Sequence, residues 1–337
     1  MGGRLFMKKL FLLLLFLLSC CIPALADEIA ITFGGDCVLG TREEWKDHPK
    51  TFDTMIAKKG YDWCFENIKE PFQTDDISLI NLECVLQSHS EGHASCKQYT
   101  FRGDPAYTDI LKVAGIEQVN IANNHYIDFS RSGRESTRAA LSEAGMGFSG
   151  YTYRSIVEVN GYKIGFAGYR ETVFLERREP VYNDLKYLKK QGCDVIIYSC
   201  HWGKEYSPTH NKRQITMADY ALKYGADIVV GTHPHCVQGI EARRGGVVLY
   251  SLGNLVFGGT HDLTTHDALM AQAVLKFEEG KYQGVMLRLL PVLTSSERPG
   301  NNFRPEFASG KDAERIMRLI QNDSEMKISR EMWFPAE

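Results

Sequence analysis

The sequence is poor in cysteine, and this scarcity excludes several classes of small or metal-stabilised domain. Nine cysteines occur in 337 residues, too few for a disulfide framework. No two of them have the Cys-x-x-Cys spacing, so the sequence contains neither a zinc ribbon nor a thioredoxin-like motif. Seven cysteines follow Ala26, an odd number that leaves at least one unpaired. Loop placement alone suggests one pairing, Cys64 with Cys96.

Long apolar runs are absent after the first 26 residues. The run at residues 10–18 is too short for a membrane-spanning helix, which needs about 20 residues, and no comparable run follows it. These features exclude a multi-span membrane protein. Residues 1–26 contain no acidic residue, carry basic residues before the apolar run and end in Ala-Leu-Ala. This pattern is typical of a secretory signal peptide.

Two ways of processing this signal are open. Cleavage after Ala26 would leave an exported, soluble protein of 311 residues (periplasmic or extracellular). The segment Leu-Leu-Ser-Cys also resembles a bacterial lipobox, which would attach a lipid to Cys20. We favour the soluble form, because the leucine at the middle position departs from the usual lipobox.

The remaining composition is that of an ordinary globular protein, with 44% hydrophobic and 24% charged residues. Disorder and collagen-like repeats are therefore excluded. Without the three cations of residues 1–26 the net charge becomes −6 instead of −3. Such a balance gives no general attraction to nucleic acid, although it is compatible with a local anion site.

Short apolar runs alternate with longer mixed segments along the rest of the chain. The runs are rich in Ile, Val, Tyr and Phe, which favours buried strands, and glycines follow two segments with helical spacing. This order predicts a layered α/β domain. The predicted strands are residues 29–34, 77–81, 118–122, 163–168, 195–199, 228–231, 247–251, 271–277 and 284–290, and the predicted helices are 134–144, 215–224 and 312–321.

Metal-capable side chains follow five of the predicted strands. Because ligands bind at the carboxyl ends of strands in an α/β sheet, these side chains are expected to converge. Imidazole with carboxylate and amide oxygens suits Mn, Fe or Zn, and the number of groups suffices for two cations. Taken singly, each residue is more often a solvated turn former; together they favour a metal site. The residues are Asp36, Glu83, Asn124, His125, His201, His233 and His235.

The chain resembles the CapA proteins of poly-γ-glutamate capsule synthesis, within the calcineurin-like metallophosphoesterase superfamily. The resemblance rests on the segments GGDCVLG, LINLECVL, ANNH, HWGKEY, GTHPHCVQ and YSLGN, which occur in the family's order. It implies a four-layer α/β/β/α sandwich with the site at the strand ends. Because the composition turns polar from residue 291, we divide the chain into the signal 1–26, one domain of residues 27–290 and a C-terminal extension 291–337. The resemblance also implies an anionic surface polymer or phosphoester as substrate, and a membrane-bound polymer synthase as partner.

The resemblance assigns a role to each candidate ligand. Asp36 and His235 would hold the first metal, and Glu83 would bridge both metals. The second metal would be held by Asn124, His201 and His233.

Three further residues complete the expected site. The resemblance makes His125 the acid that protonates the leaving oxygen, with Asp128 orienting its ring. Arg102 is a candidate for binding a phosphate or carboxylate of the substrate, since its guanidinium fork suits both. The alternative for Arg102 is a surface ion pair with Asp104.

The sequence departs from the superfamily pattern at three positions. Val38 stands where the Asp-x-His motif has histidine, Glu83 replaces an aspartate, and Tyr126 replaces the aspartate after the motif histidine. These departures leave two hypotheses open. The chain is either a metal-dependent phosphoric ester hydrolase of capsule synthesis, or a non-catalytic accessory subunit that binds the polymer or its synthase.

Overall fold

The computed structural model describes residues 27–46 and 48–336. The predicted signal peptide and Cys20 lie outside these residues. Within them, no helix is both long enough and apolar enough to cross a membrane.

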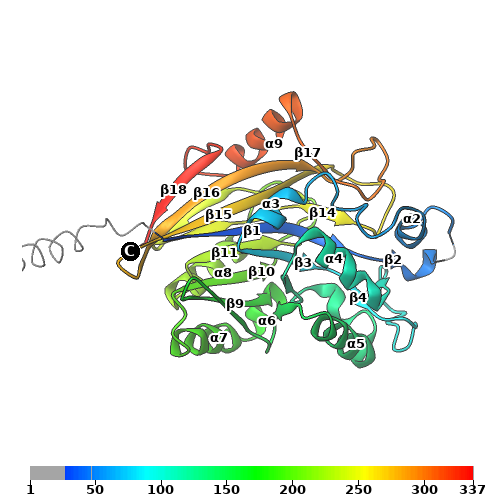
Figure 1. Cartoon of the computed structure of the whole chain (residues 1–337), viewed down its shortest axis with the longest axis horizontal. Helices are drawn as coiled ribbons and strands as arrows, with labels where there is room; N and C mark the ends of the chain where they lie inside the picture. Colours follow the sequence, from blue (N-terminus) through cyan, green and yellow to red (C-terminus); the bar gives the residue numbers. More distant parts are fainter. Residues whose placement is uncertain (1–26, 47, 337) are drawn as a thin grey trace, which may run out of the picture.

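Two mixed β-sheets form the centre of the molecule (Figure 1). The larger sheet has the order β17-β16-β15-β1-β3-β6-β7, with β14 beside β1 and β18 beside β16, and the second has the order β12-β13-β11-β10-β9-β8. The strands of the larger sheet are β1 (Asp27–Val38), β3 (Ile77–Leu82), β6 (Gln118–Asn120), β7 (Gly147–Ser149), β14 (Asn254–Phe257), β15 (Asp267–Glu278), β16 (Lys281–Leu293), β17 (Glu306–Phe307) and β18 (Glu331–Pro335). Those of the second are β8 (Ser155–Val159), β9 (Tyr162–Arg170), β10 (Val195–His201), β11 (Ile228–Thr232), β12 (Ile240–Arg243) and β13 (Gly246–Leu249).

Helices cover the outer face of each sheet. A first group packs on the larger sheet: α2 (Phe52–Lys59), α3 (Glu70–Thr74), α4 (Thr108–Ala114) and α5 (Ser130–Glu143). A second group packs on the other sheet: α6 (Glu171–Glu176), α7 (Glu179–Lys190) and α8 (Lys212–Lys223). The remaining elements are α9 (Gly310–Asn322), the small sheet of β2 (Thr41–Arg42), β4 (Val85–Leu86) and β5 (Phe101–Gly103), and the 3₁₀ turns η1 (Glu43–Trp45), η2 (Pro105–Tyr107) and η3 (Asn124–Ile127).

Three apolar cores separate these four layers. The inner core lies between the sheets, where Ile31 and Phe33 of β1 belong to the same buried cluster as Phe166 of β9 and Ile197 of β10. The two outer cores lie between each sheet and its helices. Strands that are buried on both faces need continuous apolar runs, which is the pattern the sequence shows. The predicted four-layer α/β/β/α sandwich is therefore confirmed.

Every strand and helix predicted from the sequence is present, and most extend further than predicted. β1, for example, continues through Val38 instead of ending at residue 34. β16 continues through residue 290, where the sequence predicted a domain boundary, and ends at Leu293. β18 pairs with β16, and α9 packs beside the same sheet (Figure 1). Residues after 290 thus add to the larger sheet and its cover.

The end of β1 is irregular, and this irregularity positions the first site residue. The register of β1 against β3 shifts between Phe33 and Asp36, as at a β-bulge, which re-aims the side chains that follow it. The backbone N–H of Asp36 donates to the carbonyl of Gly253 at 2.9 Å. A Cβ on Gly35 would lie 2.0 Å from that same carbonyl oxygen, so only glycine fits here.

We predict that Gly35→Ala lowers the free energy of unfolding by about 1–3 kcal/mol, because the backbone at Gly253 must move away. Chemical denaturation of the purified protein measures this change. Gly300→Ala is the matched control, since no atom lies within 4 Å of a Cβ at that position. Equal stability of the two variants would contradict the close approach.

Candidate metal centre

Asp36 is held in one orientation by a network of asparagines. Asn81, on β3, donates from Nδ2 to Asp36 Oδ1 at 2.7 Å. The Asn81 side-chain oxygen accepts from Asn120 at 2.8 Å and from Asn123 at 3.2 Å. Because both ends of the Asn81 amide are bonded, its donor side faces Asp36. Burial alone would raise the pKa of Asp36, but the hydrogen bond and positive charge of His235, with the smaller contributions of the His233 N–H and Asn81, hold that pKa below its usual value.

Three imidazoles reach the same space from the second sheet. His201 is the last residue of β10, and its Nε2 lies 2.6 Å from Asn124 Oδ1 while its Nδ1 lies 3.1 Å from Thr232 Oγ1. His233 and His235 follow β11, with φ angles of 97° and 54°. Left-handed backbone is unfavourable for a residue with a Cβ and is concentrated at functional sites. The positions of both rings therefore depend on strained backbone at His233 and His235.

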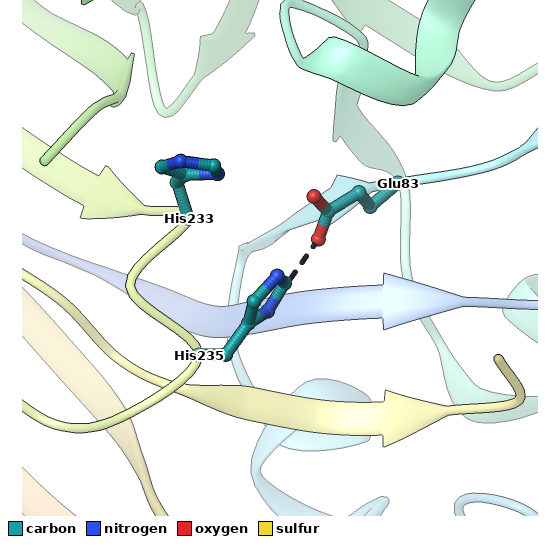
Figure 2. Close-up of side chains that lie close together, drawn as sticks. All are labelled: Glu83, His233 and His235. Atoms are coloured by element: carbon teal, nitrogen blue, oxygen red, sulfur yellow. Dashed lines mark ion pairs between the residues drawn. The ribbon is translucent and has the colours of Figure 1, made fainter. Parts of the chain in front are cut away.

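The Glu83 carboxylate lies at the centre of these groups and accepts no hydrogen bond from the described residues. Glu83 follows β3 and is fully buried. Figure 2 shows its carboxylate facing His233 and His235. Its Oε1 lies 3.3 Å from His201 Nε2, and its Oε2 lies 3.9 Å from His235 Nδ1. Within the described part of the chain, neither carboxylate oxygen accepts a hydrogen bond, and the Nδ1 of His233 is also without a partner.

These unpartnered atoms fit a bound cation. Burial raises the pKa of Glu83 well above its usual value, and the negative charge of Asp36 raises it further. Burial likewise lowers the pKa of His233 to about 4, so this imidazole is neutral and able to act as a ligand. A buried carboxylate without a partner is costly unless a positive charge compensates it. Carboxylates and neutral imidazoles are the ligands that Mn, Fe and Zn accept.

Two groups of ligand atoms can be distinguished, and Glu83 belongs to both. In each group, the ligand atoms lie within 4.8 Å of one another: Asp36, Glu83 and His201 form one, and Glu83, His233 and His235 form the other. Glu83 is the residue common to both groups, and the bridging role that the resemblance implies for it stays a prediction. The grouping of the histidines differs, because His201 was expected to share a metal with His233. Asn124 reaches the cluster through its bond to His201.

His125 stands beside this cluster with its ring fixed by Asp128. Its Nδ1 lies 2.7 Å from Asp128 Oδ2, which also accepts from the Phe101 N–H at 2.8 Å. The other Asp128 oxygen forms an ion pair with Lys97. Burial lowers the pKa of His125, and the bond to Asp128 opposes this shift. The structure thus brings together the two residues predicted as acid and orienting group.

Arg102 has partners that sequence reasoning did not identify. Its guanidinium forms a bidentate pair with Glu43, with distances of 2.7 and 3.0 Å, and donates to the Ser88 carbonyl at 2.9 Å. The Asp104 side chain instead accepts from the N–H of Ala106 at 2.9 Å in η2. The neighbouring residue Phe101 is the one that contacts His125, with ring centroids 4.2 Å apart. Binding of a substrate anion by Arg102 stays a prediction.

Three of the four cysteines next to candidate ligands pack in the apolar cores, whereas Cys236 is half-buried and its thiol donates to the Ser207 carbonyl. Cys37, Cys84 and Cys200 are fully buried among apolar residues, and burial raises the pKa of Cys84 to about 12, so its thiol stays protonated. Cys64 is buried and Cys96 exposed, and both are free. The pairing that loop placement suggested does not form.

Three other residues of the site could not be recognised as site residues from the sequence pattern. Lys97 lies in a loop without periodicity, and Asn81 was visible only as a polar residue at the end of a predicted strand. Asn254, whose Oδ1 lies 2.8 Å from His235 Nδ1, belongs to the YSLGN segment, whose pattern favours a turn.

We predict that Mn²⁺ stabilises the native chain, by about 2.7 kcal/mol when the free ion is present at 100 times its dissociation constant. Glu83→Gln should remove this stabilisation, because a charged ligand is lost. The metal-free variant should unfold at an equal or higher temperature than the metal-free native chain, since a buried carboxylate that accepts no hydrogen bond is replaced by a neutral amide. Thermal unfolding with and without Mn²⁺ measures both effects. A full Mn²⁺ shift in Glu83→Gln would contradict the site.

Comparison with known proteins agrees with the sequence resemblance. The chain is 26% identical to the PGA biosynthesis protein CapA of Bacillus subtilis, over 76% of this chain and 70% of that protein. It is 25% identical to the capsule biosynthesis protein CapA of Bacillus anthracis, over 72% of this chain and 63% of that protein. A probable polyglutamine synthesis accessory protein of Mycobacterium tuberculosis is 26% identical, over 74% of this chain and 72% of its own length.

A family match covers the described site completely. Residues 30–259 match the family described as "Bacterial capsule synthesis protein PGA_cap". This segment contains all six candidate ligands, His125 and Asp128, and it ends just after β14. The chain therefore belongs to the PGA_cap family of bacterial capsule synthesis proteins.

Proposed function

We propose that this chain acts in the synthesis or processing of an anionic cell-surface polymer of the poly-γ-glutamate type, with a two-cation phosphoesterase-type centre. Its family and the names of its relatives support the polymer. Export, with release after Ala26 or a lipid on Cys20, is part of the proposal and is supported by the signal-like residues 1–26. A membrane-bound polymer synthase is the proposed partner.

One observation carries the proposed centre: the Glu83 carboxylate is fully buried, accepts no hydrogen bond from the described residues, and lies near three imidazoles. Divalent cations, with Mn, Fe or Zn as candidates, would be held by Asp36, Glu83, Asn124, His201, His233 and His235. When bound, such cations polarise a phosphoryl oxygen and lower the pKa of water.

The residues beside the ligands suit a proton transfer. Asp128 is bonded to His125 Nδ1, so His125 Nε2 is the atom left to face a leaving oxygen. Because burial lowers the pKa of this ring, Nε2 would donate only from the protonated form, which the Asp128 carboxylate stabilises. The ion pair with Lys97 and the Phe101 N–H keep Asp128 in place. The ring of His125 is thereby oriented before substrate binds, which reduces the cost of reaching the reactive geometry.

A second candidate function is favoured by Val38. This residue occupies the place of the superfamily's motif histidine, is fully buried and offers no ligand atom. A cation site with one imidazole fewer is compatible with an accessory subunit that binds the polymer or its synthase without hydrolysis. The name of the Mycobacterium relative, an accessory protein, agrees with this alternative.

We predict that the purified chain with Mn²⁺ cleaves a generic phosphodiester such as bis(p-nitrophenyl) phosphate. His201→Ala should abolish turnover together with metal content, because a ligand is lost. His125→Ala should slow turnover by about 10²–10⁴-fold with metal content retained, as expected for loss of a general acid. Steady-state kinetics and elemental analysis on the same samples separate the two effects. Full activity in both variants would contradict the site assignment.

We predict that deletion of the gene lowers the amount of anionic surface polymer, measured by extraction and acid hydrolysis. Re-expression of the native chain should restore the polymer, and re-expression of His201→Ala should not if catalysis is required. Restoration by His201→Ala, at matched protein level, would favour the accessory function. An unchanged polymer after deletion would contradict both candidates.

A further inference from the structure

A cavity of about 440 Å³ lies beside the candidate metal centre and is rich in arginine. It is lined by the first turns of α5, by η3, by the segment between β7 and β8, and by the end of β9. We call it the arginine groove and define it by Tyr126, Arg131, Arg134, Arg138, Tyr151 and Arg170. Only one acidic residue, Glu135, lines it in the described part of the chain.

Positive charge is in excess in this groove. Arg131 forms an ion pair with Glu135 at 2.6 Å. Arg134, Arg138 and Arg170 form no ion pair with any residue that the structure describes. Four guanidinium groups therefore face one carboxylate, in a protein whose net charge is −3. An anion is attracted to this face although the protein as a whole is acidic.

The arginines of α5 form a stripe along the helix. Arg131, Arg134 and Arg138 are three and four residues apart, the spacing that places side chains on one face. Seven residues of helix extend over about 10 Å. The stripe is therefore long enough to face several charged groups of an extended chain at once.

Aromatic rings line the groove and hold one guanidinium in place. The Arg138 Nη1 donates to the Tyr126 hydroxyl at 2.6 Å, and its guanidinium carbon lies 5.1 Å from the ring centroid of Tyr153. The rings of Tyr126 and Tyr151 are stacked with centroids 5.5 Å apart. The Tyr151 hydroxyl donates to the carbonyl of Asn123 at 2.8 Å. This hydrogen bond connects the lining of the groove to the segment that carries Asn124 and His125.

The groove adjoins the candidate metal centre at two of its residues. Arg170 ends β9 and is the register partner of His201 on β10, and paired residues of neighbouring strands project from the same face of a sheet. On the other side, Tyr126 directly follows His125 in η3. The groove and the centre are thus in contact at two places, between β9 and β10 and within η3.

We propose that the arginine groove binds an extended polymer that carries carboxylates along its length, and that it holds this polymer beside the centre at His125 and His201. The inference rests on the proposed function, because it names the substrate-binding surface of that site. Guanidinium groups bind carboxylates in a bidentate manner, and the tyrosine rings offer apolar surface to the methylene groups between them.

The test is binding of a fluorescein-labelled poly-γ-glutamate oligomer to the metal-free full chain, measured by fluorescence anisotropy at low ionic strength. We expect Arg134→Gln/Arg138→Gln to weaken binding about tenfold, which corresponds to about 1.4 kcal/mol. Arg318→Gln/Arg330→Gln is the matched control, because these two arginines line a different cavity beside α9 and their loss changes the net charge equally. Arg134→Gln alone serves as a second variant, since the Arg134 side chain forms no ion pair within the described residues.

Equal weakening by both double variants would overturn the proposal, because binding would then depend on net charge only. Competition by free glutamate as effective, per carboxylate, as the unlabelled oligomer would also overturn it, since an extended chain must engage several arginines. Thermal stabilisation by Mn²⁺ should be unchanged in Arg134→Gln/Arg138→Gln. If that stabilisation and phosphodiester cleavage persist while oligomer binding is absent from the native chain, the groove assignment fails and the proposed centre stands.

Discussion

The buried carboxylate of Glu83 is the constraint on which the rest of the site depends. It lies between two sheets with three imidazoles around it and no hydrogen-bond donor assigned to it in the described residues. A charge in such a place destabilises the fold unless a positive partner is present. The left-handed backbone at His233 and His235 adds a further cost. Both costs are understandable if the folded chain binds cations that the unfolded chain cannot.

The four-layer architecture supplies what this arrangement needs. Asp36 and Glu83 come from the larger sheet, and His201, His233 and His235 come from the second, so the centre forms only when the inner core packs the sheets together. The asparagine network orders one side of the centre before any ligand arrives. On the other side, Lys97, Asp128 and His125 form a second ordered chain. The substrate would therefore meet groups whose orientation is already fixed.

Much of this arrangement could be predicted from the sequence, because short apolar runs show where the buried strands end. Short runs of Ile, Val and Phe located the central strands, and parallel strands necessarily bring their carboxyl ends to one edge. The polar residues directly after those ends, from Asp36 to His235, could therefore be identified as candidates.

Contacts made by loops could not be predicted from the sequence. The Arg102–Glu43 pair joins residues 59 positions apart, and Lys97 reaches Asp128 from a loop without periodicity. The arginine stripe was missed because α5 begins at Ser130, four residues before its predicted start, so Arg131 was not assigned to the helix.

The proposed action on an anionic polymer requires a local source of attraction in an acidic chain. Two sources are proposed: cations at Glu83 and the arginine groove beside them. The cations are the central element, since they would explain directly why the buried Glu83 carboxylate accepts no hydrogen bond in the described residues. A crystal structure of the chain grown with Mn²⁺, with anomalous diffraction recorded near the manganese absorption edge, tests them most directly. We expect two anomalous peaks that both contact Glu83, one near Asp36 and one near His233 or His235. A fully occupied Mn²⁺ elsewhere with no peak at Glu83 would contradict the metal centre.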